Sequence, residues 1–476
     1  MKNKVIIAVF SGAMILSMHG VFADKGNKPK TKTLTSRTTL LENQIRSLQS
    51  RIDAMEKRDK DHFVNRLDSL VEMYAHGPAV VTSPSLGVRR SAEDASDLMV
   101  NLSSVNEDLV LLKLRQKMDN YALEQGLPLL ERPIIAISGG VEGVADYRHR
   151  ENYTNSKKSD INFSRAELDI VGEASPWATA VINVVYEDSE HGNYGRRIDN
   201  SRFKLDRGFL TIGQLNKCPL YFTLGQIFAP FGSYSSYMLT DPVTKVLGRV
   251  KDRLILLGYS VGGIWGSLDA QMYGFSGNIK SGHELLGKSG LNLNYGYSVN
   301  KFKLNFGGGV IGNIAESSGI FGTTFVRGSE KKLEKRVYGL NARAKMGYDA
   351  ISLSAEYVGA GKSFAKSDIN FNNKGAKPQA VNLEGAIEFT TFNHPSTFAL
   401  GYGRTWQALS IELPKHSFFA TYGISLLKNA ILGFEYRHDV RYDVGTTAIT
   451  KSNTISVAQG NHRHQNIFTL QLGVYF

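Results

Sequence analysis

The chain has 476 residues, of which 42% are hydrophobic and 21% charged, and its formal net charge is +12. A single cysteine, Cys218, excludes an internal disulfide, so stability must come from backbone pairing and packing. After the first residues no apolar run approaches the roughly 18 residues that a membrane-spanning helix needs, so that only strands could cross a membrane.

Residues 1–23 are typical of a signal peptide. Lys2 and Lys4 precede an apolar run from Val5 to Leu16, and the tripeptide VFA at 21–23 supplies the cleavage site. We therefore expect export from the cytoplasm. A nucleic-acid partner is not expected for an exported chain without a clustered basic helix.

Residues 24–132 are predicted to be helical. Between 34 and 75 apolar residues recur at steps of four and three, which predicts a coiled coil, although one amphipathic helix folded back on another fits equally well. A short parallel coiled coil would suit a homotrimer. The range 76–100 is predicted to be a linker, and a second helix is expected over 102–125, opened by a capping box.

From residue 133 to residue 476 the apolar period changes to two, the period of strands with one apolar face. We count 16 alternating runs, and the connections between them alternate strictly between short and long. Short periplasmic turns and long external loops are the pattern of outer-membrane barrels. An even number of strands returns the C-terminus to the side of the N-terminal helices, which places those helices in the periplasm.

Charge indicates which face of each strand meets lipid. Apolar residues such as Leu168 and Leu470 are assigned outward, and Asp169, Glu384 and Glu435 inward. A charge that faces lipid at mid-bilayer costs about 2–4 kcal/mol, so the charged face must line the lumen. The predicted fold is therefore all-β: a 16-stranded antiparallel transmembrane β-barrel of the porin type, with an N-terminal helical, coiled-coil segment in the periplasm.

The last residues, NIFTLQLGVYF, alternate up to the terminal Phe476. In a closed barrel the last strand pairs with the first, so we expect this end to be fixed by pairing. Phe476 resembles the C-terminal aromatic residue by which the barrel-assembly machinery recognises outer-membrane proteins. The expected location is the outer membrane of a Gram-negative bacterium, in contact with its lipid.

Two motifs suggest other chemistry. Residues 282–289, GHELLGKS, match the phosphate-loop pattern, but a strand follows where nucleotide binding needs a helix. His462 and His464 could share a metal, yet no carboxylate or cysteine lies nearby in sequence, which favours solvated loop histidines. We expect no cofactor, no metal site and no enzymatic activity.

The segment TLGQIFAPFGSYSSYMLTDPVTKVLGR, residues 223–249, differs from the other connections. Pro230 has no N–H to donate to a neighbouring strand, and small polar residues follow it. The segment is therefore predicted either to fold into the lumen or to form an ordinary external loop. The candidates for a constriction on this segment are Tyr234, Tyr237, Asp241 and Lys245. The candidates on the barrel wall are Arg165, Arg343, Arg437 and Arg441.

The chain resembles the LbtU-type siderophore porins in GQIFAPFGSYSSY followed by DPVTKVLG, together with the signal peptide, the coiled coil and the barrel. The resemblance covers essentially the whole mature chain. It implies binding of a ferric siderophore at the cell surface and its passage without a TonB-coupled plug. It supplies no ligand-contacting residues.

Three functions are therefore compared. The first is a porin that takes up a ferric siderophore or another small anionic solute. The second is a general or anion-selective diffusion porin; the mixed lumen charge, with Glu and Asp among the Arg residues, argues against strong anion selectivity. The third is a structural tether, in which the helical segment joins the outer membrane to cell-wall material.

Overall fold

The computed structural model describes residues 80–82, 105–124, 126, 129, 133–150, 157–187, 202–279, 288–324, 332–427, 429–451 and 455–476. All of them belong to the compact unit Leu70–Phe476. The predicted signal peptide and the predicted coiled coil at 34–75 lie outside the described residues. Among the described residues, no helix has the length and apolar character needed to cross a membrane.

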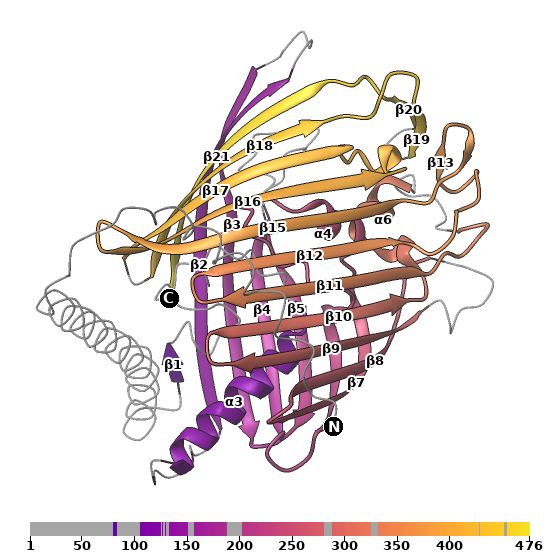
Figure 1. Ribbon diagram of the computed structural model, residues 1–476. Coiled ribbons are helices and arrows are strands. Elements are labelled where there is room, and N and C mark those ends of the chain that lie inside the picture. The colour runs from indigo at the N-terminus through magenta and orange to yellow at the C-terminus, as the bar shows by residue number, and fades with distance from the viewer. Residues whose placement is uncertain are drawn as a thin grey trace, which may run out of the picture. The chain divides into compact units, whose positions relative to one another are not determined.

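Within the described residues, sixteen antiparallel strands form one closed barrel, because each strand pairs with the next and β21 pairs back with β2 (Figure 1). This confirms the predicted fold class and strand number. The strands are β2 (Ile134–Arg150), β3 (Lys157–Ser175), β4 (Ala178–Glu187), β5 (Arg202–Gly213), β6 (Leu220–Phe228), β7 (Lys251–Gly263), β8 (Gly266–Phe275), β9 (Ser289–Val299), β10 (Phe302–Ile311), β11 (Gly339–Tyr348), β12 (Ile351–Ala360), β15 (Gln379–Thr391), β16 (His394–Trp406), β17 (His416–Leu427), β18 (Ala430–Val440) and β21 (His464–Tyr475).

The barrel closes where the chain ends. β21 pairs with β2 from Tyr475 opposite Gly140 to Gln465 opposite Arg150, and the backbone groups of Phe476 and Gly139 exchange hydrogen bonds of 2.8 and 3.0 Å. Where β21 stops, the short strand β1 (Val80–Thr82) pairs with β2 in parallel. Three residues of the predicted linker at 76–100 are therefore a strand. The expectation that pairing fixes the C-terminus is confirmed.

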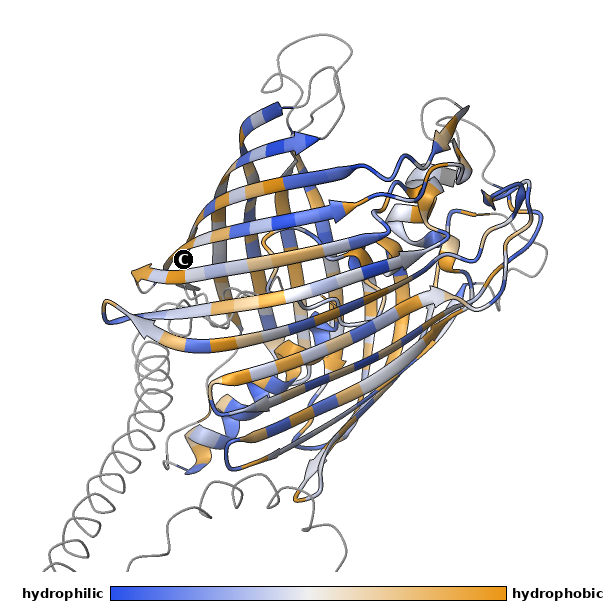
Figure 2. Cartoon of the chain, turned by 45° about the horizontal axis from the view of Figure 1, so that its top comes forward, coloured by the Kyte–Doolittle hydropathy of each residue, from blue (hydrophilic) through white to orange (hydrophobic). Residues whose placement is uncertain are grey.

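The two faces of the wall differ as the charge pattern predicts. Leu168 and Leu470 point outward and are 39% and 40% exposed, whereas Asp169, Glu384 and Glu435 point inward and are at most 5% exposed. Hydrophobic and hydrophilic residues alternate along the strands (Figure 2). A soluble sandwich would bury the apolar face under a second sheet. Here that face is the outer surface of a closed barrel.

Turns of a few residues join the strands at one end of the barrel, and the longer connections at the other end carry small elements of their own. These are α4 (Val243–Gly248), η2 (Ile314–Glu316), α6 (Ser318–Thr324), β13 (Asn370–Phe371), β14 (Lys374–Gly375), η3 (Leu409–Ile411), β19 (Thr447–Lys451) and β20 (Ile455–Gln459). Leu409, Tyr442 and Ala448 form a small buried cluster, and Phe371 packs against it, so that residues of three of these connections are in contact. The long-loop end is thus partly structured.

Candidate functional site

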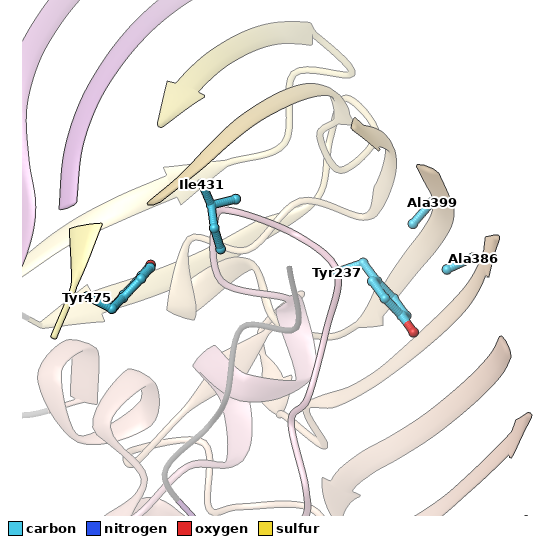
Figure 3. Packing of buried hydrophobic residues seen from close by; sticks show 5 residues of the cluster. All are labelled: Tyr237, Ala386, Ala399, Ile431 and Tyr475. Carbon is cyan, nitrogen blue, oxygen red and sulfur yellow. The ribbon is translucent and has the colours of Figure 1, made fainter. Parts of the chain in front are cut away.

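The connection between β6 and β7 folds into the barrel. We call residues 229–250 the inner loop; it contains α4. Phe231, Tyr234 and Leu247 are at most 1% exposed, and Tyr237 is directed at Ala386 and Ala399 on β15 and β16 (Figure 3). Of the two alternatives that the sequence left open, the lumen is the observed one.

Three glutamates of the inner wall fasten the inner loop. They are Glu356 on β12, Glu384 on β15 and Glu435 on β18, and each accepts at least two hydrogen bonds from consecutive loop residues. The donors are Ser233 N (2.8 Å) and Tyr234 N (2.7 Å) to Glu356, Ser236 Oγ (2.5 Å) and Tyr237 N (2.8 Å) to Glu384, and Leu239 N (2.5 Å), Thr240 N (3.1 Å) and Thr240 Oγ1 (2.6 Å) to Glu435. Buried polar groups need such partners, because an unsatisfied one is costly. The loop is therefore held across the lumen by seven hydrogen bonds to three wall residues.

A helix also occupies the lumen, against the opposite wall. This is α3 (Glu107–Glu124), whose Asp108 accepts a 2.7 Å hydrogen bond from Thr223 on β6, and whose Lys113 donates 2.7 and 2.8 Å bonds to Asp269 on β8. Arg115 donates to Thr179 on β4 at 2.8 Å. All three wall residues are inward-facing and buried.

The position of α3 corrects the sequence-based expectation. A helix was predicted over 102–125 in the periplasm; the described helix begins at Glu107 and packs on the inner face of the wall. The reason is that the inner wall is polar, so a helix that packs on it buries charged residues. Glu107, Asp108 and Arg115 are all at most 5% exposed. In sequence such residues look like a solvated helix face.

The N-terminal end of α3 meets a buried arginine. Arg207 on β5 is 1% exposed and forms an ion pair with Glu107 of the helix. The carboxylates of Glu167 and Asp169 on β3 each lie 3.7 Å from the same guanidinium. Removing one partner of such a buried group leaves charge without compensation, which is strongly destabilising. Arg207 thus joins α3 to two strands of the wall.

A second charged group lies on the inner loop. Lys245 of α4 pairs with Asp241 at 2.6 Å, and Asp241 is 44% exposed. Burial lowers the pKa of Lys245 to about 8; Asp241 opposes the shift, and Arg249 and Arg165 add to it. Lys245 therefore changes its charge close to neutral pH.

The structure brings most of the predicted site residues together. The inner loop carries four of them, Tyr234, Tyr237, Asp241 and Lys245. The wall that faces the loop carries three more, Arg165, Arg343 and Arg437. Arg343 donates to Asn341 (3.0 Å) and Asn292 (2.9 Å), and Arg437 donates to Thr240 Oγ1 (2.8 Å). Arg441 differs, because β18 ends at Val440 and places it at the long-loop rim.

Sequence reasoning missed α3, Arg207 and Glu356 as parts of the lumen. Inward-pointing charge was the available signal, and it identified Glu384 and Glu435 only as wall residues. His462 and His464 remain neighbours, with ring centres 5.8 Å apart, but their nitrogens face different partners: His464 Nδ1 lies 3.1 Å from His438 Nε2, and His462 pairs with Asp443 at 3.0 Å. Within the described ranges, no group of three or more His, Cys, Asp or Glu side chains could hold a metal ion. Most of the phosphate-loop match, 282–287, lies outside those ranges.

No family model matches the chain. A UPF0422 protein of Legionella pneumophila (strain Lens) is 35% identical over 425 residues, which cover 86% of this chain and 79% of that protein. A UPF0422 protein of Coxiella burnetii is 32% identical over an alignment of 486 residues, which covers 100% of this chain and 100% of that protein. Among solved structures, the anion-selective porin from Comamonas acidovorans has a TM-score of 0.47 at 12% identity, over 72% of this chain and 100% of that chain. Salmonella typhi OmpF in complex with daunomycin has a TM-score of 0.46 at 12% identity, over 72% and 98%.

Proposed function

The chain belongs to the UPF0422 family, and from this premise we propose that it is an outer-membrane channel that lets small polar solutes diffuse through the barrel lumen. The observation that carries the proposal is the pair of insertions in a polar lumen: the inner loop is fastened to one wall and α3 to the opposite wall. Sixteen strands enclose a lumen wide enough for water, so the two insertions set its width.

The outer face supports the membrane location. Large apolar side chains such as Leu257, Met272 and Leu291, which lie opposite one another on the adjacent strands β7, β8 and β9, are 46–55% exposed. A contiguous apolar surface of this kind is too large for a soluble monomer and suits a bilayer. Aromatic pairs lie on the same face, among them Tyr436 and Phe468 with ring centres 4.9 Å apart. Such residues are enriched where barrels meet the membrane interface.

The test is electrical. The purified full-length chain, added to a planar lipid bilayer in KCl, should produce discrete conductance steps. The control is a closure-defective variant such as Gly139→Leu, discussed below. A folded wild-type barrel that inserts but conducts no ions would contradict the proposal.

A finer candidate is uptake of a ferric siderophore, independent of a TonB-coupled plug. Besides the resemblance described above, the cations Arg165, Lys245 and Arg249, which share one electrostatic environment, favour it because they would attract an anionic chelate. Uptake of a labelled ferric chelate in a deletion strain, compared with its complemented strain, tests it. Equal uptake in both strains would exclude this cargo and leave the channel proposal intact.

The remaining partner assignments stay predictions. A homotrimer rests on the predicted coiled coil, and the tether function rests on the same residues, outside the described part of the chain. Chemical cross-linking of the purified protein tests the first. Deletion of residues 24–69 tests the second, because loss of envelope integrity with unchanged conductance would support a tether. Recognition of Phe476 by the assembly machinery is tested by replacing it with a polar residue and measuring insertion.

A further inference from the structure

A cavity of about 360 Å³ lies inside the barrel between α3, the inner loop and the wall from β8 to β15. We call it the inner chamber. Its lining contains several side-chain amides, contributed by the residue that precedes α3 and by four strands of the wall. They are Asn106, Gln271, Asn292, Asn294, Asn305 and Asn382. Among the residues that the structure describes, no aromatic side chain contributes to the lining.

The charged groups that line the inner chamber are already engaged with protein partners. Lys113 binds Asp269 at 2.7 Å, and Glu356 accepts bonds from the inner loop and from Asn341. Arg343 donates to two amide oxygens, and the ammonium of Lys345 lies 5.8 Å from the centre of the Tyr237 ring. An anionic or cationic ligand would have to lose its hydration without a dedicated counter-charge, which is costly. The chamber therefore favours an uncharged ligand.

The amides differ in how far they are committed. Gln271 donates to Tyr221 at 2.9 Å and accepts from Asn292 at 2.6 Å, so this pair is fixed in orientation. Asn294 and Asn305 line the chamber but make no side-chain hydrogen bond to any described residue. An amide offers two donors and one acceptor oxygen, a set that matches hydroxyl groups, which both donate and accept. These two asparagines are available to a solute.

The α3 side of the inner chamber contributes three apolar residues besides Asn106 and Lys113. Val105, Leu109 and Val110 of the α3 segment lie there, and Val110 is 50% exposed. A cyclic sugar has the same two-sided character, with hydroxyls at its edge and C–H groups on its faces. The volume is at the lower end of the range for small-molecule sites, roughly 300–1,000 Å³.

We propose that the inner chamber binds a small uncharged polyhydroxylated solute, of the size of a monosaccharide or a short polyol, on its way through the lumen. The proposal rests on the channel function and narrows it to one solute class. Asn294 and Asn305 are the residues that select hydroxyl groups, and the apolar strip of α3 contacts the C–H face.

The test measures block of ion current by glucose and by sorbitol in planar bilayers that contain the full-length protein. Gluconate serves as the anionic comparison, since it has a similar size and hydroxyl content. The test variant is Asn294→Ala with Asn305→Ala, which should fold because neither side chain is bonded within the described chain. The matched control is Ser298→Ala, an inward-facing position on β9 outside the lining.

Glucose should reduce the wild-type current in a concentration-dependent manner, and the double variant should raise the half-blocking concentration about tenfold, because two neutral hydrogen bonds are lost. The control should behave as wild type. Stronger block by gluconate than by glucose, or equal block of wild type and double variant, would overturn the proposal. A protein that conducts no ions would instead contradict the channel function on which it rests.

Discussion

Replacing Glu384 with alanine should loosen the inner loop without unfolding the barrel. Glu384 accepts hydrogen bonds from Ser236 Oγ and Tyr237 N, and both donor residues are at most 4% exposed. A typical hydrogen bond contributes about 0.5–1.5 kcal/mol net, so the two together contribute roughly 1–3 kcal/mol to the docked position of the loop. Glu356 and Glu435 keep the other five loop bonds. We therefore expect the loop to fluctuate in the lumen rather than leave it.

The assay is single-channel recording in planar bilayers. Glu384→Ala should increase the mean conductance and the open-channel noise, and Glu384→Gln should have a smaller effect because it keeps one neutral acceptor. Glu388→Ala is the matched control, since this residue lies on the same strand and is not one of the three acceptors. A shift between heated and unheated samples on SDS gels verifies that each barrel is folded. Equal conductance and noise in Glu384→Ala, Glu388→Ala and wild type would refute the assigned role of Glu384.

Burial lowers the pKa of Lys245 to about 8, so its ammonium is charged below that pH and neutral above it. The anion preference of the channel, measured from reversal potentials in a KCl gradient, should therefore fall between about pH 6 and about pH 10. Lys245→Met should show no such pH dependence; if the pH dependence persists in this variant, another group causes it. Arg207→Ala removes the cation that the buried carboxylates of Glu107, Glu167 and Asp169 share. The substitution should lower the free energy of unfolding by about 3–5 kcal/mol and lower the temperature at which the folded band disappears from SDS gels. An unchanged transition temperature would mean that this contact does not stabilise the protein. A Cβ at Gly139 would lie 2.7 Å from the backbone oxygen of Glu167 on β3 and 2.8 Å from the Phe476 ring, whereas one at Gly143 on the same strand would meet nothing within 4 Å. Gly139→Leu should therefore fail to give a heat-modifiable barrel and Gly143→Leu should succeed. Two equally folded variants would contradict the close approach of Gly139 to Glu167 and Phe476.

The sequence was sufficient for the barrel wall because a period of two reports burial directly. Each strand must present its apolar residues to one side, so the assignment of Leu168 and Leu470 outward and of Glu435 inward follows from local pattern alone. Alternating connection lengths then fixed the two ends. Closure followed from an apolar terminal strand, which needs a partner.

The contents of the lumen could not be predicted in the same way, because they depend on contacts between distant residues. The bonds from Tyr234 to Glu356, Tyr237 to Glu384 and Thr240 to Glu435 span 122, 147 and 195 residues of sequence. A period shows which way a side chain points but not what lies opposite it. Pro230 and Gly232 are compatible with a loop outside the barrel as well as with one inside it.

The helix shows the same limitation. The acidic residues Glu107 and Asp108 at the start of α3 are common at solvated helix N-termini, where they complement the helix dipole. Only the inward-facing Arg207 and Thr223, on strands that come about a hundred residues later, make their burial favourable. Recognising α3 as part of the lumen from sequence would have required pairing these charges across the chain.

The inner loop is bonded to β12, β15 and β18. β12 and β15 are adjacent, β16 and β17 lie between β15 and β18, and the whole arc is about a quarter of the circumference. A segment that is bonded at several points along a curved sheet resists changes in the curvature of that sheet. Lateral pressure from the surrounding bilayer that would flatten the cylinder on this side must stretch those bonds. The loop thereby adds mechanical stiffness to the ladder hydrogen bonds of the wall along that arc.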